Sequence, residues 1–312
     1  MVDPWQRLPA LSLKQIQYFV TLAQLRHFTE TANQMAITQP ALSSALRQIE
    51  SLLGGKLFHR SAQAVTLTQL GEAILPHAKG LLNTAHAAFS DMQQIALKGG
   101  EGTLRIGLIP SASSLLFPDG IKAIAERFPH LRLAIQDYTN DALLQAVTEG
   151  AIDVGIGVKE PTLLEGVVCT PLLDDELVVV VLQGDPLAGE STIAWRALLN
   201  RDIALFGHGS IHRQVTGLAH SKLPTLTLKY RVDHLETLYG MVRTGLAVAI
   251  LPRLYTTYLY DPAFRVVALQ APVVSRTLAL ISPANLVRTP QMEQVRDLLV
   301  AVITQQRAQQ GS

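Results

Sequence analysis

The sequence predicts an α/β protein in three parts: a small helical head, one long helix, and a larger body of two α/β lobes. Three patterns predict this division. Apolar residues follow a helical period within the first sixty residues, a heptad repeat runs through 68–98, and strand and helix patterns alternate from 103 onward. The chain has 312 residues, more than one average domain, which agrees with several parts.

Composition indicates folded domains and an uneven distribution of charge. Hydrophobic residues make up 48% of the chain and charged residues 16%, too apolar for a disordered protein. The net charge is +1, yet residues 1–66 carry six Lys and Arg against three Asp and Glu. A mildly basic head on a slightly acidic body favours a nucleic-acid partner for the head.

Cys169 is the only cysteine, so neither an intrachain disulfide nor a multi-cysteine metal site can form within this chain. The N-terminus lacks the apolar segment of a secretory signal, and no run approaches the roughly 18 apolar residues that span a bilayer. We therefore expect a cytoplasmic protein with no membrane partner.

Two helices are predicted at the start of the head. Ser12 and Gln15 form a capping box for the first helix. Its apolar positions recur at the helical period: Ile16, Phe19, Val20 and Ala23. Thr29 is predicted to cap a short second helix that ends near Met35.

The next helix, from Thr38 to Leu53, has an unusual polar side. Thr38 is its predicted cap, and Pro40 falls in the first turn, where a missing N–H costs nothing. The polar side holds one arginine among amides and hydroxyls: Gln39, Ser43, Ser44, Arg47, Gln48 and Ser51. A face meant only for water usually carries Lys and Glu, whereas these side chains hydrogen-bond bases and phosphates. An ordinary amphipathic helix is the alternative for this segment taken alone.

Preceded by a short helix and a tight turn, the segment from Thr38 fits a helix-turn-helix. After Gly54-Gly55, residues 56–60 and 65–68 are predicted to form a two-stranded wing.

Six short motifs in this region, in order and at the right spacing, resemble the winged helix-turn-helix of LysR-type transcriptional regulators. They are Leu11–Phe19, Phe28–Ala32, Gln39–Ser43, Ile49-Glu50, Leu57–Arg60 and Leu67–Gly71. One departure is His27, which stands where the family usually has a small residue. The resemblance implies that residues of the third helix bind the DNA major groove, with a backbone contact near the wing: Thr38, Gln39, Pro40, Ser43, Ser44, Arg47 and Arg60.

A heptad seam runs through residues 68–98, at alternating steps of four and three: Ile74, Ala78, Leu81, Ala85, Ala88, Met92 and Ile95. A 3.5-residue period suits a partner helix, so we expect this seam to pair two subunits, as the resemblance also implies. Packing against the chain's own body is the alternative. Residues 99–102, Gly-Gly-Glu-Gly, follow a helix rather than a strand and are interpreted as a hinge, not a phosphate loop.

The body, 103–307, alternates strands with helices and predicts parallel sheets covered on both faces. Strands are expected at 167–173 and 176–182, among others. Two crossings divide the body into lobe I, 103–173 and 274–307, and lobe II, 174–273, with a cleft at the carboxyl ends of the strands. The resemblance completes the fold class: α/β, with an N-terminal winged helix-turn-helix, a long linker helix, and a two-lobed periplasmic-binding-protein-like effector domain. The expected domains are therefore 1–67, 68–98, the hinge 99–102, and 103–307.

Polar loops that follow the strands give the candidate effector site. Ser111 and Ser113, in a loop leading to a helix, have hydroxyls that could hold an anion such as a carboxylate, although simple loop capping is the alternative. The remaining candidates are Thr139, Phe206, His208, Ser210, Asp233, Gly245 and Pro252. Gly245 and Pro252 bound a segment that resembles a family motif lining the cleft.

Catalytic and metal interpretations are weak. His208 and His212 have the spacing of two helical metal ligands, but no third ligand is evident and Gly209 disfavours a helix there. Ser111 lacks the glycine-flanked elbow of a serine hydrolase. Asp174-Asp175-Glu176 is interpreted as a solvated turn rather than a magnesium site. We therefore expect no enzyme activity, metal or cofactor.

The sequence thus predicts a LysR-type regulator that binds double-stranded DNA and is controlled by a small-molecule effector between two lobes. The resemblance further implies a homodimer, a homotetramer built from it, and contact with RNA polymerase. A solute-binding protein and a small-molecule enzyme with an α/β cleft are the alternatives.

Overall fold

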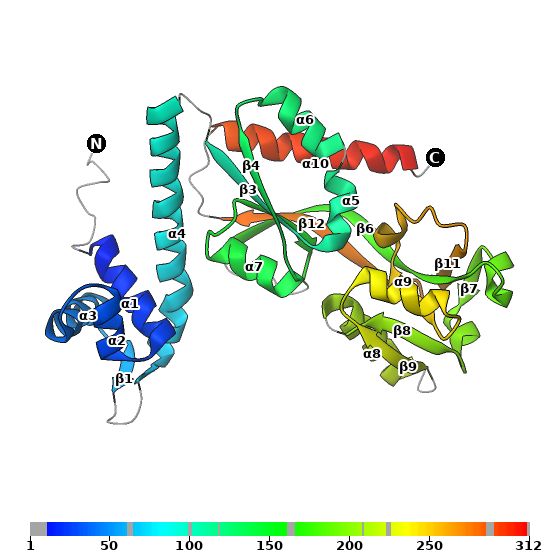
Figure 1. The fold of residues 1–312 in the computed structure, drawn as a ribbon, viewed down its shortest axis with the longest axis horizontal. Helices are drawn as coiled ribbons and strands as arrows, with labels where there is room; N and C mark the ends of the chain where they lie inside the picture. Colours follow the sequence, from blue (N-terminus) through cyan, green and yellow to red (C-terminus); the bar gives the residue numbers. More distant parts are fainter. Residues whose placement is uncertain are drawn as a thin grey trace. The chain divides into compact units, whose positions relative to one another are not determined.

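The computed structural model describes residues 11–60, 65–98, 102–117, 119–160, 166–207, 209–222, 226–284 and 290–310. The chain divides into a unit that runs through Gly102 and a unit from Thr103 to Ser312, except that 148–151 group with the first (Figure 1). The predicted hinge at 99–102 lies outside the described residues except for Gly102. Among the described residues, no helix combines the length and apolar character needed to cross a membrane.

Three helices and a two-stranded wing form the head of the N-terminal unit. They are α1 (Leu13–Leu25), α2 (Phe28–Gln34), α3 (Gln39–Leu53), β1 (Phe58–Arg60) and β2 (Val65–Leu67). The predicted capping box is confirmed, because the Ser12 hydroxyl accepts from the Gln15 N–H and the Gln15 side chain accepts from the Ser12 N–H. Thr38 caps α3 as predicted, and Gly54 ends it with a left-handed φ of 72°.

The prediction that Thr29 caps the second helix is wrong. His27 is the N-cap: its Nδ1 accepts from the Glu30 N–H at 3.2 Å. The imidazole of His27 therefore caps α2 in place of the Thr29 hydroxyl, which lies two residues later.

The core of the head fixes which side of α3 faces outward. Leu42 and Leu46 of α3 are fully buried with Phe19 and Leu22 of α1. Glu50, also buried, accepts from the Leu57 N–H at 3.0 Å and pairs with Lys56 at 2.9 Å. This carboxylate ties the end of α3 to the start of the wing.

Helix α4 (Gln69–Lys98) begins beside α1 and includes Pro76. Ala78 is buried in the core of the head, and Ile74 packs against it. The expectation that Ala78 pairs subunits is therefore corrected, because its side chain is buried in the head. Ile74 is only partly buried, and its place in a subunit seam stays a prediction. Further along, Leu81, Phe89 and Met92 are 49%, 60% and 60% exposed.

The second unit is built on a ten-stranded sheet, whose strands run in the order β4-β3-β5-β12-β6-β10-β8-β9 (Figure 1). In addition, β11 pairs with β6, and β7 pairs with β11. In lobe I the strands are β3 (Thr103–Leu108), β4 (Arg132–Asp137) and β5 (Val154–Val158). In lobe II they are β7 (Thr192–Ala194), β8 (Asp202–Phe206), β9 (Thr227–Val232), β10 (Val248–Pro252) and β11 (Phe264–Gln270). The neighbouring pairs β4–β3, β3–β5, β10–β8 and β8–β9 are parallel, as predicted.

Two long antiparallel strands, β6 (Val167–Leu182) and β12 (Ser275–Pro283), join the lobes. The sequence predicts two strands where β6 is one continuous strand. Its first half pairs with β12 and its second half with β10 and β11, so the acidic residues between the halves continue the ladder.

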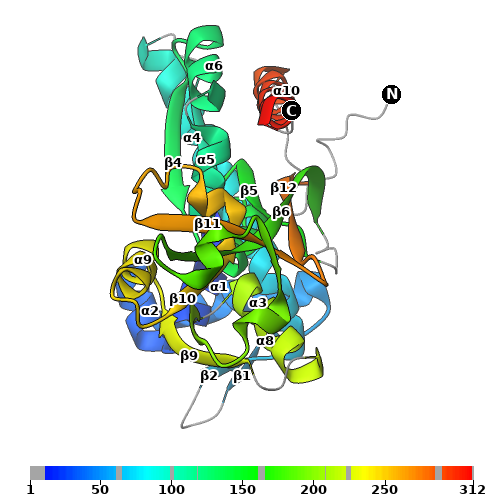
Figure 2. The same cartoon turned by 90° about the vertical axis from the view of Figure 1, so that its right-hand side faces the viewer.

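Helices cover the strands of each lobe (Figure 2). In lobe I they are α5 (Ser113–Leu116), α6 (Asp119–Arg127), α7 (Asn140–Thr148) and α10 (Pro290–Gln310). In lobe II they are α8 (Gly209–Lys222) and α9 (Leu235–Arg243). Short 3-10 turns follow β3 (Pro110–Ala112), β6 (Pro186–Gly189), β7 (Trp195–Leu198) and β10 (Arg253–Thr256). The argument that Gly209 disfavours a helix is wrong, because α8 begins at that glycine with a φ of 86°.

We expect Glu50→Ala to destabilise the head by about 1–3 kcal/mol, because it leaves the buried Leu57 N–H without its acceptor. Hydrogen exchange of α3 amides would measure this loss. Glu30→Ala, at an exposed position of α2, is the control and should change exchange little. Equal protection of α3 in Glu50→Ala and the native protein would contradict the assigned role of Glu50.

Candidate effector cleft and DNA-reading helix

The polar side of α3 lies at the surface of the head. Thr38, Gln39, Pro40, Ser44 and Arg47 are exposed, and Ser43 is half-buried. Gln48 is tied to α1, since its Oε1 accepts from Gln15 Nε2 at 2.6 Å. Arg60 ends β1, and its side chain is outside what the structure describes. Among the described residues, the polar side of α3 that is predicted to contact DNA is therefore accessible to solvent.

In the second unit, a cleft opens where β3, β8 and β9 end. It consists of two hollows, of about 420 and 350 Å³. The two share five lining residues, Pro110, Phe206, Asp233, His234 and Tyr255, and so form one continuous depression. Their lining comes from both lobes, which places the cleft where the strand order predicts a ligand.

A buried ion pair lies beside this cleft and joins the two crossing strands. Arg276 of β12 and Asp175 of β6 are 5% and 2% exposed. Arg276 donates to Asp175 Oδ2 from Nη2 at 2.9 Å and from Nε at 3.2 Å. Asp175 is therefore not part of a solvated turn, as the acidic run suggested, because β12 covers it.

The same ion pair contacts a loop from each lobe. Arg276 Nη2 donates to the Ser111 hydroxyl of lobe I at 2.6 Å. Asp175 Oδ1 accepts from the Leu254 N–H of lobe II at 3.0 Å. Burial raises the pKa of Asp175, and this effect outweighs the opposing effects of Arg276 and the Leu254 amide. One pair thus positions the wall of the cleft on both sides.

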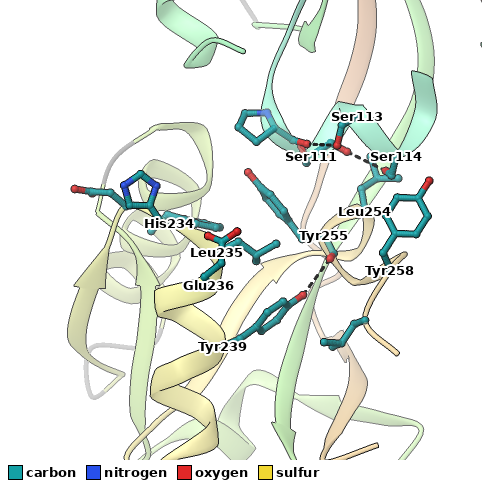
Figure 3. A pocket seen from close by; sticks show the side chains of 14 residues that line it. Ser111, Ser113, Ser114, His234, Leu235, Glu236, Tyr239, Leu254, Tyr255 and Tyr258 are labelled. Atoms are coloured by element: carbon teal, nitrogen blue, oxygen red, sulfur yellow. Dashed lines mark hydrogen bonds between the residues drawn. The ribbon is translucent and has the colours of Figure 1, made fainter. Parts of the chain in front are cut away.

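Tyrosines line the middle of the cleft (Figure 3). Tyr255 lies between the serine loop at Ser111 and the first turn of α9 (Figure 3). Burial raises the pKa of the Tyr255 phenol, while hydrogen bonds with Ser111 lower it. The Tyr239 hydroxyl donates to the Tyr255 carbonyl at 3.0 Å, and burial raises the pKa of Tyr239 to about 12.

Two further contacts bridge the lobes at the edges of the cleft. The Tyr258 hydroxyl donates to the Phe117 carbonyl at 3.0 Å. Arg213 of α8 pairs with Glu160, which follows β5, at 3.1 Å. Both pairs are solvent-accessible, so each adds little to stability by itself.

The structure brings most of the predicted effector residues into this cleft: Ser111, Ser113, Thr139, Phe206, Ser210 and Asp233. His208 lies outside the described residues. Gly245 and Pro252 line neither hollow, which corrects their assignment. Gly245 forms a left-handed turn before β10, at the other end of that strand from the cleft, and Pro252 is buried where β10 ends.

Sequence reasoning missed several residues of the cleft: Glu236, Tyr239, Tyr255, Tyr258 and Arg276. Asn140 begins α7 and clamps Val158, accepting from its N–H at 2.7 Å and donating to its carbonyl at 3.2 Å. The tyrosine-rich run that follows Pro252 in the sequence was a usable signal. Arg276 gave no local signal, because its partner is 101 residues away.

Among the described residues, no group of three or more His, Cys, Asp or Glu is arranged to hold a metal ion. His212 lies in α8, and its Nε2 is 3.4 Å from the Thr216 hydroxyl.

The fold and its surfaces define a class: a DNA-binding head with a two-lobed ligand-binding unit. Comparisons with known proteins agree. Residues 13–72 match the bacterial regulatory helix-turn-helix model of the lysR family, and residues 98–304 match the LysR substrate binding domain.

Curated relatives and solved structures extend over nearly the whole chain. The uncharacterized regulator YbhD of Escherichia coli is 27% identical, covering 94% of this chain and 92% of its own. A hydrogen peroxide-inducible genes activator of Pectobacterium carotovorum is 27% identical, over 93% and 96%. A full-length OxyR variant from Pseudomonas aeruginosa has a TM-score of 0.62 at 26% identity and covers 95% of each chain. The chain belongs to the LysR family: it is a DNA-binding transcriptional regulator with an effector-binding domain, and not an enzyme.

We expect Asp175→Ala to lower the free energy of unfolding of the second unit by about 3–5 kcal/mol, because it leaves the Arg276 charge buried and unpaired. Denaturant unfolding would measure the loss. Asp202→Ala, which breaks the more exposed pair with Lys229, is the control and should cost about 0–1 kcal/mol. Similar losses in the two variants would show that the Asp175 pair has no special role. The double change Asp175→Leu with Arg276→Met should recover much of the stability.

Proposed function

We propose that α3 lies in the major groove of double-stranded DNA and that its exposed polar side chains contact the bases. The observation that carries this proposal is the division of α3 into an apolar side, buried at Leu42, Leu46 and Ile49, and an open side of amides, hydroxyls and one arginine. A buried stripe holds the helix rigidly, and a rigid helix can present side chains to base edges in register. The residues proposed for this contact are Thr38, Gln39, Pro40, Ser43, Ser44 and Arg47, with Arg60 at the backbone.

Helix α4 is proposed to pair two subunits through the part of its seam beyond the head. Leu81, Phe89 and Met92 are large apolar side chains exposed on one helix, which is costly unless another surface covers them. A dimer would place two copies of α3 on one duplex, one helical turn or a multiple apart. Assembly of dimers into a tetramer and contact with RNA polymerase are part of the proposal on family grounds.

The signal is proposed to be a small molecule bound in the cleft. Several relatives are named for hydrogen peroxide, but Cys169 is the single cysteine here and cannot form a disulfide within the chain. Burial also raises the pKa of its thiol, which lowers the fraction of reactive thiolate. Because the cleft is lined from both lobes, a ligand there would favour one angle between them and so alter how the subunits hold DNA.

We expect Arg47→Ala to weaken binding to a selected genomic site by about 1–3 kcal/mol and to relax sequence preference. Selection of genomic fragments by the purified protein would supply the site, and fluorescence anisotropy would measure affinity for it and for random DNA. The control is Arg132→Ala, an exposed arginine of β4 in the second unit. Equal loss on specific and random DNA would assign Arg47 to a phosphate instead.

We expect Met92→Glu combined with Leu81→Glu to shift the protein toward monomers, because each places a charge in the proposed subunit seam. Light scattering after size exclusion would measure the mass. Glu substitutions at Gln69 and His86, exposed positions of α4 outside the seam, are the control. An unchanged oligomer would contradict pairing through this seam.

A further inference from the structure

The charged side chains that line the cleft are mostly acidic. Asp233 and Glu236 line the larger hollow, and Asp137 and Asp233 line the smaller one. Among the described lining residues, the one lysine or arginine is Arg276. The cleft therefore carries three carboxylates against a single guanidinium, which is the reverse of what an anionic ligand requires.

That guanidinium is already neutralised. Arg276 is buried, makes two hydrogen bonds to Asp175 and donates a third to the Ser111 hydroxyl. An anion in the cleft would compete with Asp175 for this charge.

The serine loop, which the sequence suggested for a carboxylate, offers little to an anion. The Ser113 hydroxyl donates to the Pro110 carbonyl at 2.7 Å, and the Ser114 hydroxyl donates to the Ser111 carbonyl at 3.0 Å. These protons are used within the loop. The helix that follows, α5, has only four residues and therefore a weak dipole.

Aromatic rings line part of the larger hollow. Tyr239 and Tyr258 donate their hydroxyls to backbone carbonyls, so their polar ends are already bonded. Phe206 and Tyr255 contact each other with ring centroids 5.2 Å apart. Tyr255 lies in the middle, with Glu236 and His234 on one side of it and Tyr258 on the other side (Figure 3). Aromatic faces beside carboxylates attract organic cations through the ring quadrupole and the negative charge.

We propose that the cleft binds a protonated organic amine, with its ammonium at Asp233 and Glu236 and its apolar body against Phe206 and Tyr255. The hollows, of about 420 and 350 Å³, have the size of a small-molecule site. This inference rests on the proposed function and deepens it, because it assigns a chemical class to the effector of the same cleft.

The test uses the full chain and two sets of probes matched in shape. The first set is 2-phenylethylamine, 2-phenylethanol and phenylacetate, and the second is hexylamine, hexanol and hexanoate. Thermal shift and titration calorimetry would measure binding. Both amines should raise the melting temperature, while the alcohols and acids should not. Tighter binding of an acid than of its amine, or no shift with either amine, would overturn the proposal.

Charge-neutralising variants locate the ammonium. Glu236→Gln and Asp233→Asn should each weaken amine binding about two- to fivefold, in line with ion-pair and cation–π contacts at exposed carboxylates. Glu190→Gln, an exposed carboxylate that lines neither hollow, is the matched control and should bind as the native chain does. Circular dichroism would show that the variants are folded. Native affinity in both cleft variants would overturn the assignment.

DNA binding, measured separately, distinguishes failure of this inference from failure of the proposed function. If an amine binds through Asp233 and Glu236 but leaves DNA affinity unchanged, the amine site stands and its effector role fails. If DNA affinity responds to an acid bound in the cleft and not to the amine, the effector role stands and the amine class is overturned.

Discussion

The second unit depends on the buried ion pair between Arg276 and Asp175. Each residue lies on one of the two strands that cross between the lobes, and each also holds a loop of the cleft, Ser111 on one side and Leu254 on the other. Burying two charges is costly, and attraction offsets that cost only when the remaining hydrogen-bonding groups are satisfied, as they are here. The pair therefore fixes the geometry of the site more than it adds to stability.

The continuous strand β6, which is paired with β12, explains how this ion pair can contact loops of both lobes. Strand β6 runs unbroken from one lobe to the other, and its first half is hydrogen-bonded to β12, so the connection is not made of two loose linkers. Ligand-driven motion in such an arrangement requires bending of paired strands, and the bridges at the rim, Tyr258 to Phe117 and Arg213 to Glu160, would break or form as the lobes move. A site lined from both lobes is well suited to couple occupancy to that bending.

The head is stabilised mainly by apolar packing, whereas the second unit depends on a buried ion pair. Its helix α3 is held by apolar packing of Leu42 and Leu46 and by the buried carboxylate of Glu50, which leaves the opposite side free for polar side chains. The two parts of helix α4 differ: its first turns complete the core of the head, while Leu81, Phe89 and Met92 further along are exposed.

Local structure and family membership could both be predicted from the order of residues along the chain. Periodicity and capping rules predict the caps at Ser12 and Thr38, the apolar stripe of α3, and the alternation of strands and helices. Each of these features depends on residues that are close together in the sequence. The loops that end parallel strands also follow from order along the chain, which is why Ser111, Phe206 and Asp233 were predicted for the cleft. Burial of individual side chains and the charge balance of the cleft depended on the tertiary structure. Asp175 was predicted to be solvated, but β12 covers it, and Ala78 was predicted for a subunit seam, but it is buried in the core of the head. The acidic, aromatic character of the cleft appears only when distant loops converge. Burial and charge balance depend on partners remote in sequence, and no local pattern records those partners.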